Sequence, residues 1–301
     1  MSARADVQLK DFPSLFSLRD KTAVITGGSR GLGLHAASGL LQAGCAKVFI
    51  TSRKAKACEE ACEALNALGC QGKAFSVPAD LAKAGEVERL VGEVEKYTDK
   101  VDILFANAGA TWGAAFDEHP ESAFEKVMKL NVQSVFVCCQ KYETLLISQA
   151  GVTASLTSTL HHRFAPLLRK AGTQEDPSRI IITASIAGIG IGSVGEHATF
   201  GYNASKAAAL HLAKGLAVEL GPQNILTTAI APGFFPTKMA SGLMELTGGT
   251  KALAEANPNR RLGVPEDIAG TVVFLCSRAG SHVNGSSIVL DGGAIYGKSR
   301  L

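Results

Sequence analysis

The sequence has no apolar run long enough to span a bilayer and no basic block of the kind that binds nucleic acid or a membrane surface. Its 30 basic and 27 acidic residues give a formal net charge of +3, so charge indicates no macromolecular partner. The first residues include acids and lack an apolar core, which argues against a secretory signal. We therefore expect a small-molecule substrate, with no nucleic-acid and no membrane partner.

The seven cysteines follow no disulfide or metal pattern. Cys58 and Cys62 are spaced as on one helix face, Cys138 and Cys139 are adjacent, and none has a histidine at zinc-ligand spacing. We interpret all seven as reduced thiols of an intracellular protein and expect no metal site.

What the sequence has in abundance is glycine, at 32 residues, and a regular alternation of apolar strands with helical segments. Near-continuous apolar strands joined by helical crossovers predict a parallel sheet covered on both faces. The fold class is α/β: a single doubly wound Rossmann-type domain with a sheet of about seven strands flanked by helices. We assign residues 1–20 to an N-terminal extension and 21–298 to this domain. The expected strands lie at 21–27, 46–52, 72–80, 101–109, 179–185, 224–233 and 286–293, and the first two helices at 32–43 and 54–68.

Residues 142–163 interrupt the alternation. The block is rich in serine and threonine, has weak periodicity, and separates two pieces that would otherwise join into one amphipathic helix. We interpret it as a surface insertion in which His161 and His162 are solvated rather than metal ligands.

The last three residues, Ser299-Arg300-Leu301, keep the small, basic and leucine pattern of the peroxisomal Ser-Lys-Leu signal. We predict a peroxisomal location, with the cytoplasm as the alternative.

A glycine-rich turn follows the first expected strand and opens the first helix. Glycines there permit positive φ and let a pyrophosphate approach backbone N–H groups at a helix N-terminus. The spacing is G-x-x-x-G-x-G, and a merely structural turn is the alternative. The residues assigned to this phosphate site are Gly27, Ser29, Arg30, Gly31, Leu32 and Gly33.

The end of the second strand lacks the acid that usually binds the adenosine ribose 2′-OH in NAD sites. It reads Thr51-Ser52-Arg53, and Arg30 lies in the nearby glycine turn. Two guanidinium groups suit a 2′-phosphate, which arginine grips with bidentate charge-assisted bonds. The pattern therefore favours NADP(H), although Arg53 could simply be an exposed arginine at a helix start.

The stretch Gly201 to Lys206, written GYNASK, places Tyr202 one helical turn before Lys206. A packed helix face alone would explain this spacing. A proton donor beside a fixed cation is the functional alternative, and such a cation would lower the pKa of the phenol.

Taken in order, the motifs resemble the short-chain dehydrogenase/reductase family in its single-domain branch. They are the glycine turn, Asp80-Leu81, Asn107-Ala108-Gly109, Asn131 in KLNVQSVF, Ser185 in ITASIAG, Tyr202 and Lys206 in YNASK, and Pro232-Gly233 in IAPGFFPTKM. The resemblance covers essentially residues 21–293, outside the inserted block.

The resemblance implies a catalytic set of Asn131, Ser185, Tyr202 and Lys206. Tyr202 would be the general acid, Ser185 would position the substrate oxygen, Lys206 would hold the nicotinamide ribose, and Asn131 would anchor a water. Beyond the glycine turn, the implied cofactor contacts are Ser52, Arg53, Asp80, Leu81, Asn107, Ala108, Gly109, Tyr202, Lys206, Pro232, Gly233, Phe235 and Thr237. Phe234 and Phe235 would pack near the nicotinamide.

Within the family, the chain is most similar to NADPH-dependent 3-oxoacyl (β-ketoacyl) reductases of the rhamnolipid-biosynthesis type, through NAGATWGAAF, EKVMKLNVQSVF, GEHATFGYNASKAA and APGFFPTKM. The resemblance implies reduction of a ketone to a secondary alcohol. Reductases of polyketide, aromatic or cyclic ketones are alternatives. So are a peroxisomal dienoyl-thioester reductase, which Tyr202 argues against, and a non-catalytic NADP-binding regulator.

The resemblance also implies a mobile lid over the substrate at residues 239–258, for which an ordinary surface helix is the alternative. Trp112 follows the Asn107-Ala108-Gly109 turn, where substrate loops gather in such sheets. A homodimer or homotetramer is expected, and the inserted block is predicted to alter or weaken it.

Overall fold

The computed structural model describes residue 9 and residues 11–140, 142–144, 159–161, 163–240, 242 and 248–297, with only the backbone described at 142–144 and 159–161. The peroxisomal signal predicted at 299–301, residues 1–8 and 10 of the N-terminal extension, and most of the inserted block lie outside these residues. The predictions made for those segments stay predictions.

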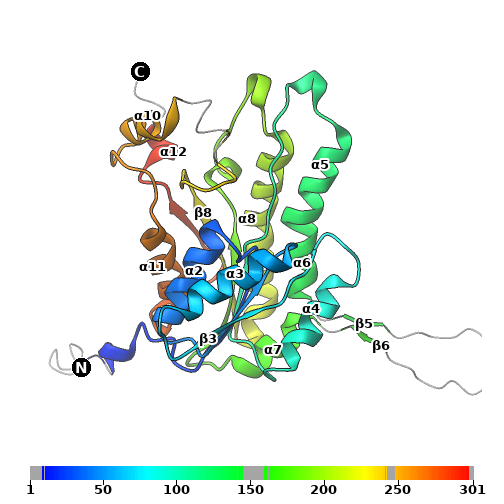
Figure 1. Cartoon of the computed structure of the whole chain (residues 1–301), viewed down its shortest axis with the longest axis vertical. Helices are drawn as coiled ribbons and strands as arrows, with labels where there is room; N and C mark the ends of the chain where they lie inside the picture. The colour runs from blue at the N-terminus through cyan, green and yellow to red at the C-terminus, as the bar shows by residue number, and fades with distance from the viewer. Residues whose placement is uncertain are drawn as a thin grey trace, which may run out of the picture.

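One seven-stranded sheet forms the centre of the molecule (Figure 1). All its strand pairs are parallel, in the order β3-β2-β1-β4-β7-β8-β9. The strands are β1 (Thr22–Thr26), β2 (Lys47–Thr51), β3 (Lys73–Ser76), β4 (Ile103–Ala106), β7 (Ser178–Thr183), β8 (Ile225–Pro232) and β9 (Ser287–Leu290). Six of the seven lie inside a predicted strand range and β7 begins one residue before its range, at Ser178, so the predicted fold class is confirmed.

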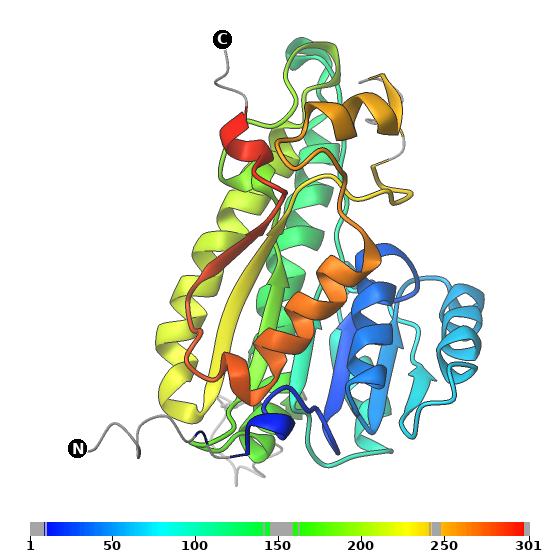
Figure 2. The same cartoon turned by 90° about the vertical axis from the view of Figure 1, so that its left-hand side faces the viewer.

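Helices cover both faces of the sheet. One face carries α2 (Gly31–Gln42), α3 (Ala55–Asn66) and α11 (Pro265–Cys276), and Figure 2 shows α11 beside α2. The other carries α4 (Glu86–Glu95), α6 (Ser134–Cys139), α7 (Phe164–Ala171) and α8 (Phe200–Leu220), with α5 (Glu121–Met128) packed against α8.

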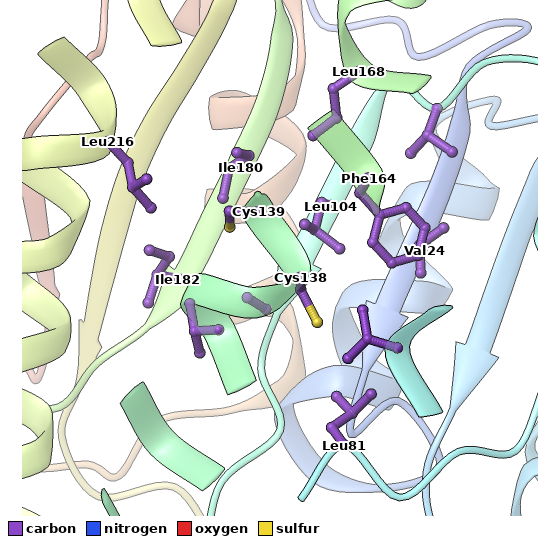
Figure 3. Packing of buried hydrophobic residues seen from close by; sticks show 14 of the residues in the cluster. Val24, Leu81, Leu104, Cys138, Cys139, Phe164, Leu168, Ile180, Ile182 and Leu216 are labelled. Atoms are coloured by element: carbon purple, nitrogen blue, oxygen red, sulfur yellow. The ribbon is translucent and has the colours of Figure 1, made fainter. Parts of the chain in front are cut away.

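Two hydrophobic cores result from this layering, because alternate residues of each strand point to opposite faces. Val24 packs with α4 and α7 in one core, whereas Ala23 and Ile25 pack with α2 and α11 in the other. Figure 3 shows the first core, in which Phe164 of α7 lies near Val24 and Leu104. The fully buried strands therefore read as continuous apolar runs.

The inserted block begins and ends with paired backbone. β5 (Tyr142–Thr144) and β6 (Thr159–His161) form a two-stranded antiparallel ribbon, which the weak periodicity did not indicate. The flanking pieces are separate helices, since α6 ends at Cys139 and α7 begins at Phe164. In Figure 1 the ribbon lies beside α7, outside the layers of the central sheet.

The candidate site lies at the carboxyl ends of the strands, where open parallel sheets bind ligands. Strand order reverses between β1 and β4, which are neighbours in the sheet but are separated in the chain by β2 and β3. The connections leaving β1 and β4 therefore diverge and leave room for a ligand. The same end carries α10 (Gly249–Ala256) and α12 (Ala294–Gly297) (Figure 1).

Candidate functional site

The glycine turn joins β1 to α2, and its backbone conformation and close packing require glycine at three positions. Gly27 and Gly31 have φ values of 64° and 54°, which favour glycine. A Cβ on Gly33 would lie 2.5 Å from the carbonyl oxygen of Gly27. Since α2 begins at Gly31, its unpaired N–H groups lie directly after this turn, as an anion site requires.

The turn is fixed to the end of β4 by a threonine and an asparagine. Thr26 Oγ1 accepts hydrogen bonds of 2.9 Å from the backbone N–H groups of both Asn107 and Ala108. Asn107 Nδ2 donates to the carbonyl oxygens of Thr26 and Gly27, at 3.1 and 3.2 Å. The side chain of Asn107, predicted as a cofactor contact, thus also has a structural role.

Two predicted phosphate-binding arginines are available for a ligand. Gly28 N donates a 3.2 Å hydrogen bond to the carbonyl oxygen of Thr51, which brings the turn with Arg30 next to the end of β2. Arg30 and Arg53 are both exposed, and neither side chain has a hydrogen-bond or ion-pair partner within the described part of the chain. Ser52 Oγ lies 3.1 Å from Cys58 Sγ. The site is therefore electropositive where the 2′-phosphate was predicted.

Asp80 and Leu81 follow β3 and lie beside the extended end of β2. Ala79 N donates to the Ser52 carbonyl oxygen at 3.1 Å, which brings the segment alongside Ser52. Asp80 Oδ1 accepts from Ala82 N at 3.3 Å, and Leu81 is buried. Both residues therefore lie at the same edge of the sheet as the glycine turn.

The segment after β8 reaches back to the glycine turn. A Cβ on Gly31 would lie 3.3 Å from Thr237 Cγ2, so the two predicted cofactor contacts are neighbours. Phe235 is buried, and its ring occupies the space that a side chain on Gly263 would need. Phe235 is a packing residue as predicted, and a cofactor contact there would come from the backbone.

The predicted catalytic lysine is deeply buried. Lys206 is 4% exposed, and its Nζ donates a 2.7 Å hydrogen bond to the carbonyl oxygen of Thr183 on β7. Its Nζ also lies 5.5 Å from the centre of the Tyr202 ring. Burial lowers the pKa of Lys206 to about 8, because charge is disfavoured away from water.

Asn131 lies in a π-helical segment, η3 (Lys129–Gln133), between α5 and α6. Its Oδ1 accepts from Ala110 N at 2.8 Å, and its Nδ2 donates to Ala110 O and to Ser205 Oγ, both at 2.9 Å. A Cβ on Gly109 would lie 3.2 Å from this Oδ1 and 3.6 Å from Lys206 Nζ. The π-turn thus brings Asn131 into the same site as the lysine, which is a common use of such bulges.

Ser185 directly follows the strand residues that hold Lys206, and its side chain is hydrogen-bonded to that of Tyr202. Ser185 Oγ also accepts from Ala187 N at 3.1 Å, which fixes its rotamer. All four predicted catalytic residues therefore meet at the carboxyl end of the sheet, although they come from η3, the segment after β7, and α8.

The prediction that Lys206 lowers the pKa of Tyr202 is wrong for the polypeptide by itself. Burial raises the pKa of the Tyr202 phenol, and the hydrogen bond with Ser185 offsets only part of the rise. Sequence spacing indicates that the cation and the phenol are neighbours, but it does not show how thoroughly both are removed from water.

Three supporting residues escaped the sequence analysis: Thr26, Thr183 and Ser205. Thr26 holds the turn after β4, and Thr183 accepts the lysine bond through its backbone. Ser205 Oγ accepts from Asn131 and donates to the Tyr202 carbonyl oxygen at 2.7 Å. Only Ser205 gave a signal, as the residue before the lysine in YNASK.

The cysteines lie away from this chemistry. All seven are free in the structure and six are buried. Burial raises the pKa values of Cys62, Cys138 and Cys276 to about 12, so these thiols stay protonated and unreactive near neutral pH. Among the described residues, no group of three or more His, Cys, Asp or Glu residues could hold a metal, and no helix is long and apolar enough to cross a membrane.

The loop after β4 is bonded to the loop before α8. Ala114 N donates to Ala198 O at 3.1 Å and joins the loop after β4 to the loop before α8. Trp112 is 46% exposed in the first of these loops. Part of the predicted lid is the helix α10, and residues 241 and 243–247 of the lid lie outside the described residues.

Comparison with known proteins places the chain in a family. The short chain dehydrogenase profile matches residues 21–163, and the profile described as enoyl-(acyl carrier protein) reductase matches residues 157–294. A rhamnolipids biosynthesis 3-oxoacyl-[acyl-carrier-protein] reductase of Pseudomonas aeruginosa is 39% identical over 279 residues, which cover 92% of this chain and 97% of the relative. The chain belongs to the short-chain dehydrogenases/reductases.

Other relatives show the breadth of the family. A 5-keto-D-gluconate 5-reductase of Escherichia coli K12 is 34% identical over 281 residues, covering 93% of this chain and 98% of that protein. Among solved structures, the Pseudomonas aeruginosa RhlG/NADP active-site complex superposes with a TM-score of 0.80 at 36% identity, covering 94% of this chain and 99% of that one. Levodione reductase superposes with a TM-score of 0.77 at 26% identity, over 92% and 98% of the two chains.

Proposed function

We propose that this oxidoreductase uses NADPH to reduce the ketone of a 3-oxoacyl or related substrate to a secondary alcohol. The observation that carries the proposal is the meeting of Asn131, Ser185, Tyr202 and Lys206 at one end of the sheet, beside the glycine turn. The similarity to a 3-oxoacyl reductase and to an NADP complex supports the same assignment.

The residues present fit an NADP molecule. Gly33 lets the start of α2 pack directly against the glycine turn, where a Cβ would clash with the carbonyl oxygen of Gly27, so a pyrophosphate could approach the N-terminus of α2. The exposed Arg30 and Arg53 offer charge-assisted bonds to a 2′-phosphate. Asp80 and Leu81 would border the adenine, Asn107 to Gly109 the ribose, and Pro232 to Thr237 the nicotinamide. When bound, NADPH supplies the hydride.

Tyr202 is the proton donor to the carbonyl oxygen. Its raised pKa keeps the phenol protonated at neutral pH, so the proton is present when the substrate arrives. Ser185, already bonded to that phenol, would give a second hydrogen bond to the same substrate oxygen. The Lys206 cation near the ring stabilises the phenolate that proton donation leaves behind.

Asn131 holds the base of the site. Its Nδ2 donates to Ala110 O and Ser205 Oγ and its Oδ1 accepts from Ala110 N, so it fixes the loop after Gly109 relative to Lys206. The predicted water between Asn131 and Lys206 would renew the proton on Tyr202 through the lysine.

A second substrate class has support of its own. Similarity to 5-keto-D-gluconate 5-reductase and to levodione reductase favours smaller polar or cyclic ketones as the alternative. A dienoyl-thioester reductase is disfavoured, because the tyrosine and lysine are both in place. A non-catalytic NADP-binding regulator would not need Asn131, Ser185, Tyr202 and Lys206 at one site.

The test is loss of reduced-nicotinamide absorbance, with NADPH and NADH in parallel. The panel contains 3-oxoacyl thioesters, 5-ketogluconate, cyclic diketones and aromatic ketones, and Tyr202→Phe is the control. Turnover with NADPH on a 3-oxoacyl thioester, abolished in Tyr202→Phe, is the expected result. Tight NADPH binding without turnover on any ketone would overturn the reductase assignment in favour of the regulator.

We also propose a homo-oligomer that uses the outer face of α5, η3, α6 and α8. An open groove of about 650 Å³ lies there, and its apolar lining comes from Met128, Val132, Phe136 and Leu212. Phe136 is 40% exposed, and covering it would remove apolar surface from water. The peroxisomal location stays a proposal, tested by whether removing 299–301 changes the distribution of a fusion with an N-terminal fluorescent protein.

A further inference from the structure

The short C-terminal helix α12 lies between the catalytic serine's loop and the end of the predicted lid. Figure 2 shows α12 at the carboxyl end of the sheet, at the same end as α10 and the loop that precedes α8. None of the residues assigned to catalysis or cofactor binding belongs to α12.

Asp291 fixes this helix to the end of β9. Its Oδ1 accepts from Gly293 N and its Oδ2 from Ile295 N, both at 2.8 Å, so each carboxylate oxygen satisfies one N–H group. Gly292 and Gly293 have φ values of 62° and 90°, which permit the turn between Asp291 and the helix. The Asp291 side chain therefore anchors the start of α12.

Asp291 also lies against Gly233, which in turn neighbours Ile186. A Cβ on Gly233 would be 2.7 Å from Asp291 Cβ and 3.6 Å from Ile186 Cδ1. Gly233 belongs to the predicted nicotinamide segment, and Ile186 begins the short helix η4 (Ile186–Gly188) directly after Ser185. The aspartate thus stands where these two segments meet.

From there, α12 makes contact in two directions. Ile295 Cγ1 lies 3.6 Å from the position of a Cβ on Gly190, and Gly190 N is bonded to Ile186 O at 2.9 Å. On the other side, a Cβ on Gly293 would lie 3.4 Å from Pro258 Cβ, and Pro258 is the last residue of the predicted lid. The helix is therefore a bridge between the Ser185 loop and the lid.

We propose that Asp291 is a positioning residue that sets the width of the substrate cleft by holding α12 between the Ser185 loop and the end of the lid. This inference rests on the proposed role of Ser185 in orienting the substrate oxygen. Asp291 acts through Ile295 and Pro258 and does not itself meet the reacting atoms. Its loss would affect the KM for the ketone more than cofactor binding.

The first test is hydrogen–deuterium exchange on the full chain with NADPH present, read in peptides covering 186–199 and 257–263. Asp291→Ala removes both bonds and should raise exchange in both peptides about fivefold, the size expected for a lost cap. Asp291→Asn keeps one acceptor oxygen, so its exchange in both peptides should lie between that of the wild type and that of Asp291→Ala. Ile295→Ala, which leaves Gly233 untouched, should raise exchange in 186–199, whereas Val218→Ala on the exposed surface of α8 should change neither peptide.

The second test is kinetic, on whichever ketone the wild type reduces. Asp291→Ala should raise KM about fivefold while the Kd for NADPH changes less than about twofold, with partial rescue in Asp291→Asn. Unchanged exchange in both peptides, or an equal rise throughout β1 and β4 in all three variants, would overturn the proposal. A wild type that binds NADPH and turns over nothing would defeat the proposed function alone, since exchange still tests the bridge.

Discussion

Lys206 Nζ and the carbonyl oxygen of Thr183 are joined by a buried 2.7 Å hydrogen bond. Thr183 Oγ1 in turn donates to Asn107 Oδ1 at 3.1 Å, and Asn107 Nδ2 donates to the carbonyl oxygen of Gly27. One chain of contacts therefore runs from the Lys206 ammonium through the ends of β7 and β4 to the glycine turn. It sets the spacing between the proposed proton donor and the proposed phosphate site, which come from opposite halves of the chain.

The buried lysine should make stability depend on pH. Its pKa is about 8 when folded and about 10.4 when unfolded, so between these values the unfolded chain holds a proton that the folded chain has lost. The free energy of unfolding of the wild type should therefore rise relative to that of Lys206→Met between pH 7 and 9.5, by about 2 kcal/mol. Urea denaturation at several pH values measures it.

The comparison with Lys206→Met is essential to that experiment. Buried thiols with raised pKa values, such as Cys62 and Cys276, make the free energy of unfolding fall as pH rises, because unfolded cysteines lose protons above about pH 8.5. This contribution is the same in both proteins and cancels in the difference. A difference in the free energy of unfolding that stays flat or falls with pH would show that folding does not lower the pKa of Lys206.

Ser205→Ala tests how firmly Asn131 must be held. The change leaves Asn131 Nδ2 its bond to Ala110 O but removes the one to Ser205 Oγ. We expect a loss of about 1 kcal/mol in the free energy of unfolding and a fall in kcat of about tenfold, with little change in KM. Ser205→Thr, which keeps the hydroxyl, is the matched control. Full activity in the alanine variant would show that Ala110 alone positions the amide.

Arg53→Ala tests cofactor choice. Removing a bidentate contact to the 2′-phosphate should raise the Kd for NADPH about 10- to 100-fold and leave the Kd for NADH unchanged, since NADH lacks that phosphate. Quenching of reduced-nicotinamide fluorescence gives both constants. Lys251→Ala also removes one positive charge, from a residue on α10 whose side chain is 91% exposed, and therefore controls for the change in net charge. Equal weakening of both cofactors would contradict a specific contact.

Replacing residues 142–161 with a short Gly-Ser linker tests the inserted block. We expect the deletion to change the assembly state toward larger oligomers while NADPH binding is kept, because the block starts where α6 ends, next to the proposed interface. Light scattering gives the mass. Adding Phe136→Glu, which places a charge in the apolar groove, should return the protein to smaller species. Unchanged mass and activity in the deletion variant would count against any role in assembly.

Much of the fold could be predicted because its signals are local. The strand of Thr22–Thr26 reads as a buried apolar run, and Gly27 to Gly33 carry spacing that only a tight turn into a helix explains. The short ribbon of β5 and β6 could not be predicted, since three-residue strands hold too few residues to show a period.

The sequence by itself determined the class of fold, the glycine cradle, the missing acid after the second strand and the pairing of Tyr202 with Lys206 on one helix turn. Each of these depends on residue type and short spacing. Only the tertiary structure decided that burial raises the pKa of Tyr202 and lowers that of Lys206, that Asn131 is held by Ala110 and Ser205, and that Asp291 lies against Gly233. These are properties of segments brought together from distant parts of the chain, and desolvation and close contact exist only once those segments have packed.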